Sequence, residues 1–159
     1  MSQGHPEVSR WFVGADHRGF SLKRVIVGYL AENGLDVEDV GSFDEESVDY
    51  PPIALRLARK VAISPHFRGV LLCGSGVGMS IMANRLRGVR AALAWSEEVA
   101  KLSRAHNDAN VLVLPAAFLD TKAALEVMKA WMVTPFDGGR HLRRVRMMDD
   151  IGDIGQERC

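Results

Sequence analysis

Short apolar runs alternate along the chain with longer stretches in which apolar residues recur at helical spacing. The apolar runs predict strands at residues 11–15, 35–40, 69–73, 89–95 and 110–114. The helical spacing predicts helices at residues 20–32, 49–61, 79–86, 97–106 and 121–133, and a basic helix that starts near residue 140. Five strand–helix units with mostly short connections predict a parallel sheet covered by helices on both faces.

The pattern indicates one domain. The chain has 159 residues, 47% of them hydrophobic, which is enough to bury one sizeable core. We assign residues 10–151 to this domain, residues 1–9 to a flexible leader and residues 152–159 to a polar tail.

Charge and composition argue against several classes of function. Lys plus Arg and Asp plus Glu each number 20, so the net charge is zero and no bulk attraction to nucleic acid or to an anionic membrane is expected. No apolar run reaches about 18 residues, and the N-terminus lacks the apolar stretch of a signal peptide. The two cysteines, Cys73 and Cys159, are expected to be free thiols in a reducing compartment. We therefore expect a cytoplasmic protein, and no Cys/His cluster has the spacing of a zinc site.

Polar clusters stand where the predicted strands and helices end. Asp16 and His17 follow the first strand, and residues 73–78 follow the third. Ligands of such folds bind beyond the carboxyl ends of parallel strands, so we expect these two clusters at one sheet edge. His106 and Asn107 end a helix instead, which predicts that they lie at the opposite edge of their own subunit's sheet.

The segment Gly74-Ser75-Gly76-Val77-Gly78 joins a buried strand to a helix. Glycines let backbone N–H groups approach an anion, but a tight turn needs small residues equally, so both interpretations stay open. A dinucleotide fingerprint is argued against because Met79 replaces its third glycine. A hydrolase elbow is argued against because Cys73 stands where it needs glycine, and no Gly-Lys-Ser/Thr Walker sequence occurs.

Cys73 ends the strand that leads into this loop. A thiol at a helix N-terminus can have a lowered pKa and then act as a general base near neutral pH. The alternative is a small buried hydrophobe, which is the usual role of a free cysteine.

Other charged residues also have two interpretations each. Asp16 and His17 either transfer protons or bind phosphate, or Asp16 caps a helix. His106 either takes part in chemistry or balances a helix dipole. Arg140 and Arg144, which are four residues apart, either bind a phosphate dianion or form a solvated basic face.

Five motifs, taken together, carry a resemblance. They are Gly14 to Gly19 (GADHRG), Asp49 to Pro51 (DYP), Cys73 to Gly78 (CGSGVG), Leu102 to Asp108 (LSRAHND) and Gly138 to His141 (GGRH). In order and spacing they resemble the type B ribose-5-phosphate isomerases and the related galactose-6-phosphate isomerase subunits, over about residues 10 to 150.

The resemblance implies a Rossmann-like three-layer α/β/α sandwich with a five-stranded parallel sheet and an extra C-terminal helix. It implies a homodimer or tetramer whose active sites lie between two subunits, so that His106 and Asn107 of one chain reach Cys73 of another. It implies no metal, no other cofactor, and no nucleic-acid or membrane partner.

The reaction implied is the interconversion of D-ribose 5-phosphate and D-ribulose 5-phosphate through a cis-enediolate. By resemblance, Cys73 transfers the proton, and Asp16 with His106 opens the furanose ring. The enediolate would be held by Ser75 and by the backbone N–H groups of Gly74, Gly76 and Gly78. The sugar would be bound by Tyr50 and Asn107, and the phosphate by His17, Arg140 and Arg144.

One departure from the resemblance leaves the substrate open. The segment Pro115-Ala116-Ala117 lacks an arginine that many members carry after the fifth strand, so that Arg143 or another residue would have to supply a phosphate contact. The same chemistry on a tetrose, allose or galactose phosphate is therefore an alternative. A non-catalytic phosphosugar- or nucleotide-binding module on this fold is a second alternative.

Overall fold

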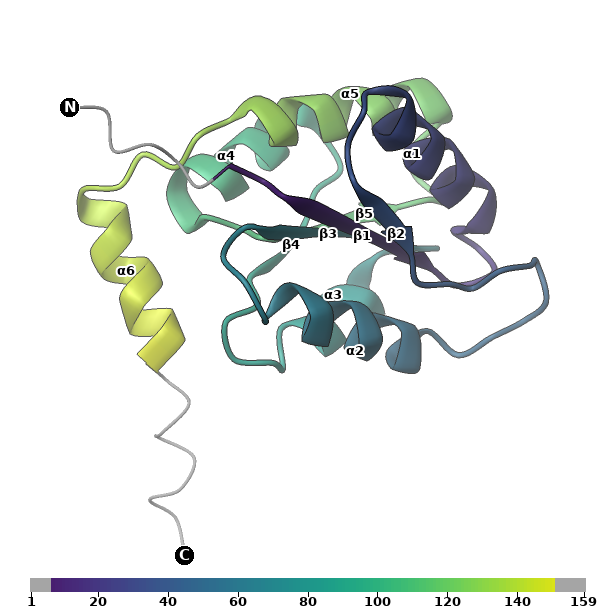
Figure 1. The fold of residues 1–159 in the computed structure, drawn as a ribbon, viewed down its shortest axis with the longest axis horizontal. Coiled ribbons are helices and arrows are strands. Elements are labelled where there is room, and N and C mark those ends of the chain that lie inside the picture. The colour runs from purple at the N-terminus through teal and green to yellow at the C-terminus, as the bar shows by residue number, and fades with distance from the viewer. Residues whose placement is uncertain (1–6, 151–159) are drawn as a thin grey trace, which may run out of the picture.

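The computed structural model describes residues 7–150, in which five strands alternate with six helices (Figure 1). The strands are β1 (Arg10–Ala15), β2 (Val37–Asp39), β3 (Phe67–Cys73), β4 (Ala91–Leu93) and β5 (Val111–Pro115). The helices are α1 (Phe20–Glu32), α2 (Tyr50–Val61), α3 (Val77–Ala83), α4 (Glu97–Asn107), α5 (Thr121–Val133) and α6 (Arg140–Asp149).

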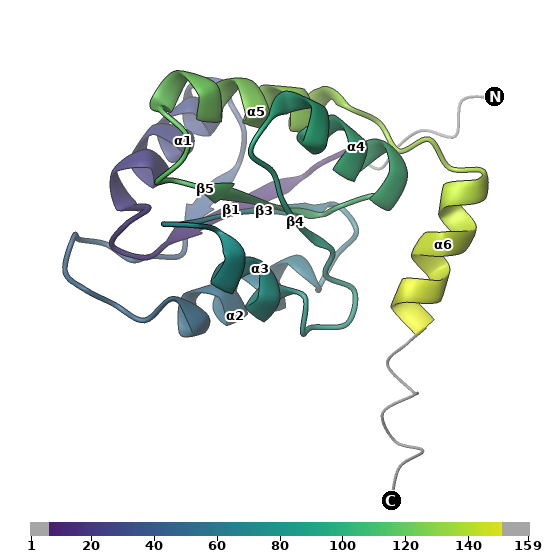
Figure 2. The same ribbon diagram turned by 180° about the vertical axis from the view of Figure 1, so that it is seen from behind.

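The five strands form one parallel sheet in the order β2-β1-β3-β5-β4. Helices α1, α4 and α5 cover one face of the sheet, and α2 and α3 cover the other (Figures 1 and 2). This arrangement confirms the predicted three-layer α/β/α sandwich, its five-stranded parallel sheet and its additional C-terminal helix.

The central strand β3 contributes to two hydrophobic cores because successive side chains point to opposite faces. Val70 and Leu72 pack with the layer of α1, α4 and α5. Leu71 and Cys73 pack with the layer of α2 and α3. The alternation therefore places the thiol of Cys73 on the α2/α3 face, at the carboxyl end of the sheet.

Both edge strands are shorter than predicted. Residues 35–40 and 89–95 form only the three-residue strands β2 and β4, because each of them pairs with a single neighbour. Helix α3 likewise ends at Ala83 rather than near residue 86, where tight turns take over. The long, strongly periodic helices α1 and α5 have the predicted bounds.

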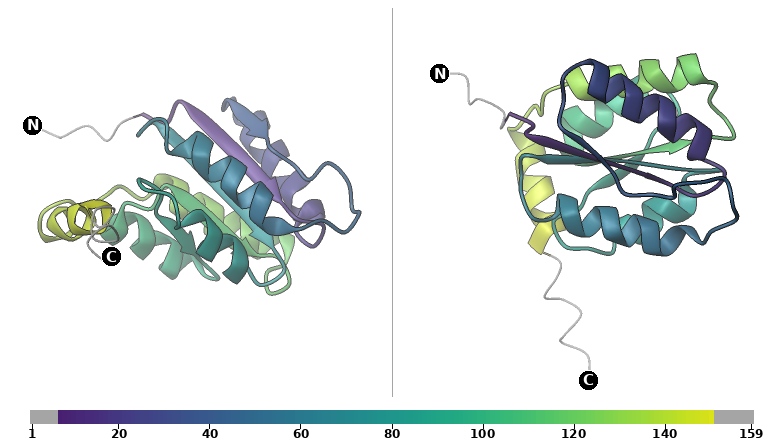
Figure 3. Two further views of the ribbon diagram at one scale, coloured as in Figure 1. Left: turned by 90° about the horizontal axis from the view of Figure 1, so that it is seen from below. Right: turned by 45° about the vertical axis from the view of Figure 1, so that its right-hand side comes forward.

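Helix α6 packs on its own chain at the end of the sheet opposite the carboxyl ends of the strands (Figures 2 and 3). His141 and Val145 are buried, and Arg90 forms an ion pair with Asp149 at 3.0 Å.

Residues 1–6 of the predicted leader and the predicted tail lie outside the described residues. Among the described helices, none is both long enough and apolar enough to cross a membrane.

Candidate active site

The turn after β1 and the loop after β3 meet at the carboxyl edge of the sheet, as predicted. The backbone N–H of Asp16 donates to the carbonyl of Leu72 at 3.2 Å. At Gly19 the approach is so close that a Cβ atom would lie 2.6 Å from the same carbonyl oxygen. Only glycine therefore lets the turn rest against the end of β3.

Asp16 is almost fully buried and organises this turn. Its Oδ1 accepts hydrogen bonds from the backbone N–H groups of Arg18, at 2.9 Å, and Gly19, at 3.1 Å. The first residue before α1 is Gly19, which makes no side-chain cap. Asp16 thus closes the turn that leads into α1, and its carboxylate remains at the sheet edge beside the β3 loop.

His17 points toward the long loop between β2 and α2. Its Nδ1 accepts a hydrogen bond from the backbone N–H of Val48 at 3.2 Å. In the neutral imidazole this leaves the proton on Nε2, which can donate to an anion. The loop itself is anchored by Lys23, a fully buried lysine whose Nζ bonds Asp39 at 2.7 Å and also the carbonyl of Ser42.

Cys73 is 5% exposed, and its Sγ accepts a hydrogen bond from the Gly76 N–H at 3.2 Å. Burial raises the pKa of the thiol. The backbone N–H groups of Met79 and Gly76, together with Arg18, act in the opposite direction, whereas Asp16 adds to the rise. The predicted lowering of this pKa is therefore wrong in the isolated subunit, because desolvation of the thiolate outweighs the nearby N–H groups.

The glycine loop is closely packed, which supports the structural interpretation of its glycines. A Cβ atom on Gly78 would lie 2.6 Å from the Tyr50 hydroxyl oxygen, and one on Gly74 would lie 2.7 Å from the Arg18 Cζ. Gly76 has a φ of 77°, in the left-handed region that favours glycine. Ser75 is exposed and its Oγ accepts the Val77 N–H at 3.3 Å, which leaves the hydroxyl hydrogen free to donate.

The remaining predicted site residues lie at the opposite sheet edge of the same chain. His106 and Asn107 end α4, and Arg140 and Arg144 lie on α6. These two helix segments lie beyond the amino ends of the strands, whereas Cys73 ends β3 (Figure 3). The two groups of residues therefore lie apart within one chain. This confirms the prediction that His106 and Asn107 lie at the opposite sheet edge of their own subunit.

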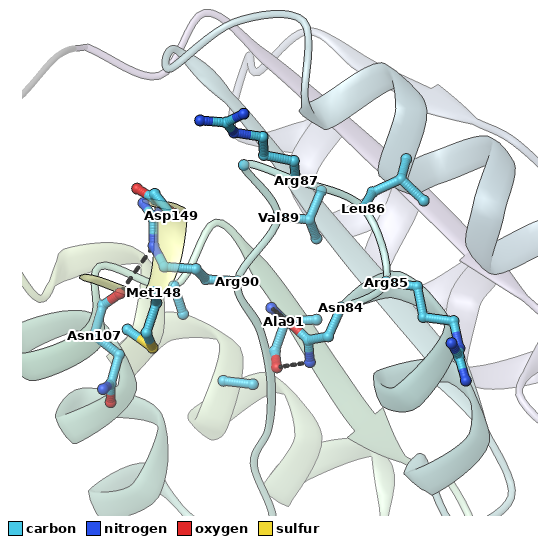
Figure 4. A pocket seen from close by; sticks show the side chains of 13 residues that line it. Asn84, Arg85, Leu86, Arg87, Val89, Arg90, Ala91, Asn107, Met148 and Asp149 are labelled. Carbon is cyan, nitrogen blue, oxygen red and sulfur yellow. Dashed lines mark hydrogen bonds and ion pairs between the residues drawn. The ribbon is translucent and has the colours of Figure 1, made fainter. Parts of the chain in front are cut away.

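Asn107 lines a hollow of about 730 Å³ between the end of α3, β4 and α6 (Figure 4). Arg90 crosses its wall and is bound to Asp149 and to Asp108. Cys73 lines neither this hollow nor the smaller one beside Trp131. The carboxyl edge thus holds Cys73 and Asp16, and the hollow belongs to the opposite edge.

The His106 imidazole stacks on His141, with ring centroids 4.2 Å apart and an angle of 4° between the ring planes. The Asp137 carboxylate lies 4.0 Å from the His106 Nε2. Ligand atoms of these three residues lie within 4.8 Å of one another, so they could in principle hold a metal ion. Imidazole lone pairs lie in the ring plane, and two parallel planes do not converge on one ion, so this arrangement does not fit a metal.

Three residues of this architecture were missed from the sequence: Arg18, Lys23 and His141. Arg18 lies in the GADHRG motif, but no pattern in the sequence shows that its side chain lies against Gly74. Lys23 falls within an amphipathic helix, where a lysine normally indicates the solvent face. The contact of His141 with His106 joins two helices, and no local pattern predicts it.

Known proteins resemble this chain over most of its length. The family described as Ribose/Galactose Isomerase matches residues 12–148. The chain is 41% identical over 138 residues to ribose-5-phosphate isomerase B of Escherichia coli K12. The matched residues cover 87% of this chain and 93% of that protein.

Solved structures of relatives superpose over most of the chain. A ribose 5-phosphate isomerase of Thermotoga maritima is 45% identical with a TM-score of 0.85, covering 89% of this chain and 97% of that one. Ribose-5-phosphate isomerase B of Mycoplasma genitalium, solved with bound ribulose-5-phosphate, is 36% identical with a TM-score of 0.85 and covers 88% and 93%.

Proposed function

Because the chain belongs to the ribose/galactose isomerase family, we propose that it interconverts D-ribose 5-phosphate and D-ribulose 5-phosphate. It is a sugar-phosphate isomerase of the ribose-5-phosphate isomerase B type. The observation that carries the finer proposal is the meeting of Cys73 with Asp16 and the glycine loop at one sheet edge. A cytoplasmic location stays a prediction of the sequence.

Cys73 is the base of this proposal. Its thiolate takes the proton from C2 of the open-chain aldose, which leaves a cis-enediolate, and the resulting thiol returns that proton to C1. A second proton passes between the two enediolate oxygens, so the ketose has the same composition as the aldose. Because burial raises the thiol pKa, a smaller fraction is thiolate at neutral pH, but each thiolate is a stronger base.

The enediolate would be held by groups around the β3 loop. Ser75 offers an exposed hydroxyl, and Gly74 and Gly78 offer backbone N–H groups. The Gly76 N–H is bonded to the Cys73 Sγ in the free subunit, so it would serve the sulfur first and the enediolate only after the thiol is formed.

Binding and ring opening need residues from both sheet edges. Asp16 and His106 would open the furanose ring, and Tyr50 and Asn107 would bind the sugar. His17 supports phosphate binding through its Nε2–H, and it would act with Arg140 and Arg144. Since these residues do not meet within one chain, we propose that each site forms between two copies in a homodimer or a tetramer.

Exposed apolar side chains support the second copy. Val77 and Ile81 are 48% and 59% exposed on one face of α3, and Trp95, after β4, is 59% exposed. Phe118, after β5, is 75% exposed. Large exposed apolar side chains on the segments that follow β3, β4 and β5 are typical of a surface that another protein covers.

Replacing the thiol tests this function. Cys73→Ala should lower kcat for ribose 5-phosphate by roughly 10²- to 10⁴-fold, the worth of a general base, while ribose 5-phosphate still binds. Calorimetric binding alongside turnover separates the two effects. Turnover near the wild-type level in Cys73→Ala would refute the assignment of the base, and a wild-type protein that binds but never isomerises would indicate a binding module.

A substrate panel tests the choice of sugar. The same chemistry suits tetrose, allose and galactose phosphates, and Ala117 leaves the phosphate end without an arginine at that position. We expect kcat/KM to be highest for ribose 5-phosphate among these aldose phosphates. If ribose 5-phosphate ranked among the poorest, the reaction would stand and the proposed substrate would be wrong.

A further inference from the structure

The guanidinium of Arg18 lies directly on the first residue of the β3 loop. A Cβ atom built on Gly74 would lie 2.7 Å from the Arg18 Cζ and 2.8 Å from its Nε and Nη1. Gly74 follows Cys73 directly in the chain, and the Arg18 charge acts on the Cys73 thiol and lowers its pKa. A side chain larger than hydrogen at residue 74 would displace the guanidinium.

Contacts of the turn around Arg18 fix its backbone against the end of β3. The Asp16 Oδ1 accepts the Arg18 backbone N–H at 2.9 Å, and the Asp16 N–H donates to the Leu72 carbonyl at 3.2 Å. Gly19, the next residue, touches the same carbonyl so closely that no side chain fits. The turn therefore fixes the backbone of Arg18 at the end of β3, and from there the side chain reaches Gly74.

The Arg18 guanidinium has no anionic partner within residues 7–150. It forms no ion pair there and its side chain donates no hydrogen bond, and the residue is exposed. An arginine whose backbone is held in place often binds an anion, because the planar fork of N–H donors on its guanidinium matches a carboxylate or a phosphate. Arg18 and Asp16 are the two charged side chains that act on the thiol of Cys73, in opposite directions.

We propose that Arg18 supplies the positive charge that stabilises the thiolate of Cys73 in the proposed isomerase site. The proposal rests on the proposed function and adds a residue that acts through Cys73 without touching the reacting carbons. Ala117, whose N–H donates to the Gly74 carbonyl at 2.9 Å, presents only a methyl group at this rim. Arg18 is thus the guanidinium available beside Gly74.

The charges that face Cys73 from the elements packed against it define the expected direction. Burial and Asp16 raise the thiol pKa, whereas Arg18 and the N–H groups of Met79 and Gly76 lower it. Removal of the Arg18 charge leaves the raising groups less opposed. The thiol pKa should rise by a few tenths of a unit to about one unit, since the cation is partly solvated.

Alkylation of Cys73 measures this without relying on catalysis. In a Cys159→Ser background Cys73 is the only thiol, and its rate of reaction with iodoacetamide is followed against pH. Arg18→Gln should move the midpoint upward, and Arg18→Lys should restore most of the wild-type value. Arg24→Gln removes the same charge from an exposed position on α1 and should leave the midpoint unchanged.

The isomerase assay gives a second readout. The acidic limb of kcat/KM should shift in the same direction in Arg18→Gln, with a loss of about two- to tenfold at neutral pH. An unchanged alkylation midpoint in Arg18→Gln, or an equal shift in Arg24→Gln, would overturn the proposal. Active Cys73→Ala would overturn the proposed function instead, and the alkylation result would still decide the role of Arg18.

Discussion

The imidazole rings of His106 and His141 stack face to face, 4.2 Å between centroids, and join the end of α4 to the start of α6. The backbone N–H of Asp137 donates to the Ala105 carbonyl at 2.9 Å and closes the same corner. His106 therefore has its orientation set by a residue on another helix. A charge on one ring opposes a charge on the other.

This stack predicts that acid destabilises the protein in a particular pH window. Burial and the nearby His106, Arg140 and Arg144 lower the pKa of His141, and Asp137 only partly opposes them. A group whose pKa is lower in the folded state stabilises the fold at pH values above its ordinary pKa of 6.5. That contribution is lost as pH falls from 6.5 through the lower pKa of the folded state. The free energy of unfolding should fall between pH 7 and pH 5.

Urea unfolding of the wild type and of His141→Phe at pH 7.5 and pH 5.5 checks this. Phenylalanine keeps a ring on His106 but takes up no proton, so the variant should lose less stability on acidification. Carboxylates titrate alike in both proteins and cancel in the comparison. Equal losses would show that His141 is not the sensitive group.

The corner formed by His106, Asp137 and His141 should not need a metal ion. Its parallel rings do not direct two lone pairs at one point. Dialysis against EDTA should leave kcat/KM for ribose 5-phosphate unchanged. Loss of activity that zinc or another divalent ion restores would show that the rings rotate to bind a metal.

Lys23 should matter for stability and for the loop between β2 and α2. Removal of one partner of a wholly buried ion pair costs about 3–5 kcal/mol, but the Asp39 side chain is 31% exposed and keeps some water. Lys23→Met should therefore lower the free energy of unfolding by about 2–3 kcal/mol. Because the loop holds His17 through Val48, KM for ribose 5-phosphate should rise as well.

The neighbouring Arg24, exposed on the same helix, supplies the matched control. Arg24→Met should change the free energy of unfolding by less than about 0.5 kcal/mol and leave KM unaffected. Denaturant unfolding and steady-state kinetics on both variants are sufficient. A Lys23→Met protein as stable as Arg24→Met would mean that the ion pair of Lys23 with Asp39 makes no net contribution to the free energy of unfolding.

The fold was predictable where local signals were strong. Helix α1 ends at Glu32, directly before the Asn33-Gly34 pair that predicts its end, and the uninterrupted apolar run before Cys73 marks the central strand. Edge strands were predicted too long, because apolar residues continue beyond the last pairing partner and the sequence does not reveal where a neighbour stops.

The site was predictable as a set of motifs but not as a set of charges. Placing His106 at a helix end was enough to put it at the opposite edge from Cys73. The pKa direction at Cys73 was wrong because a one-residue view counts the helix N-terminus and not the burial that the rest of the fold imposes. The contact of the Arg18 guanidinium with Gly74 depends on a turn packed against β3, which no spacing in the sequence describes.

Complementation between two inactive variants tests most directly whether each active site combines Cys73 of one chain with His106 of another. Cys73→Ala and His106→Ala should each be nearly inactive alone. After the two are unfolded together and refolded, half of the dimers pair unlike chains, and each of these has one intact site of two, so activity should return to about a quarter of the wild-type level. A refolded mixture no more active than its two components would contradict a site shared between subunits.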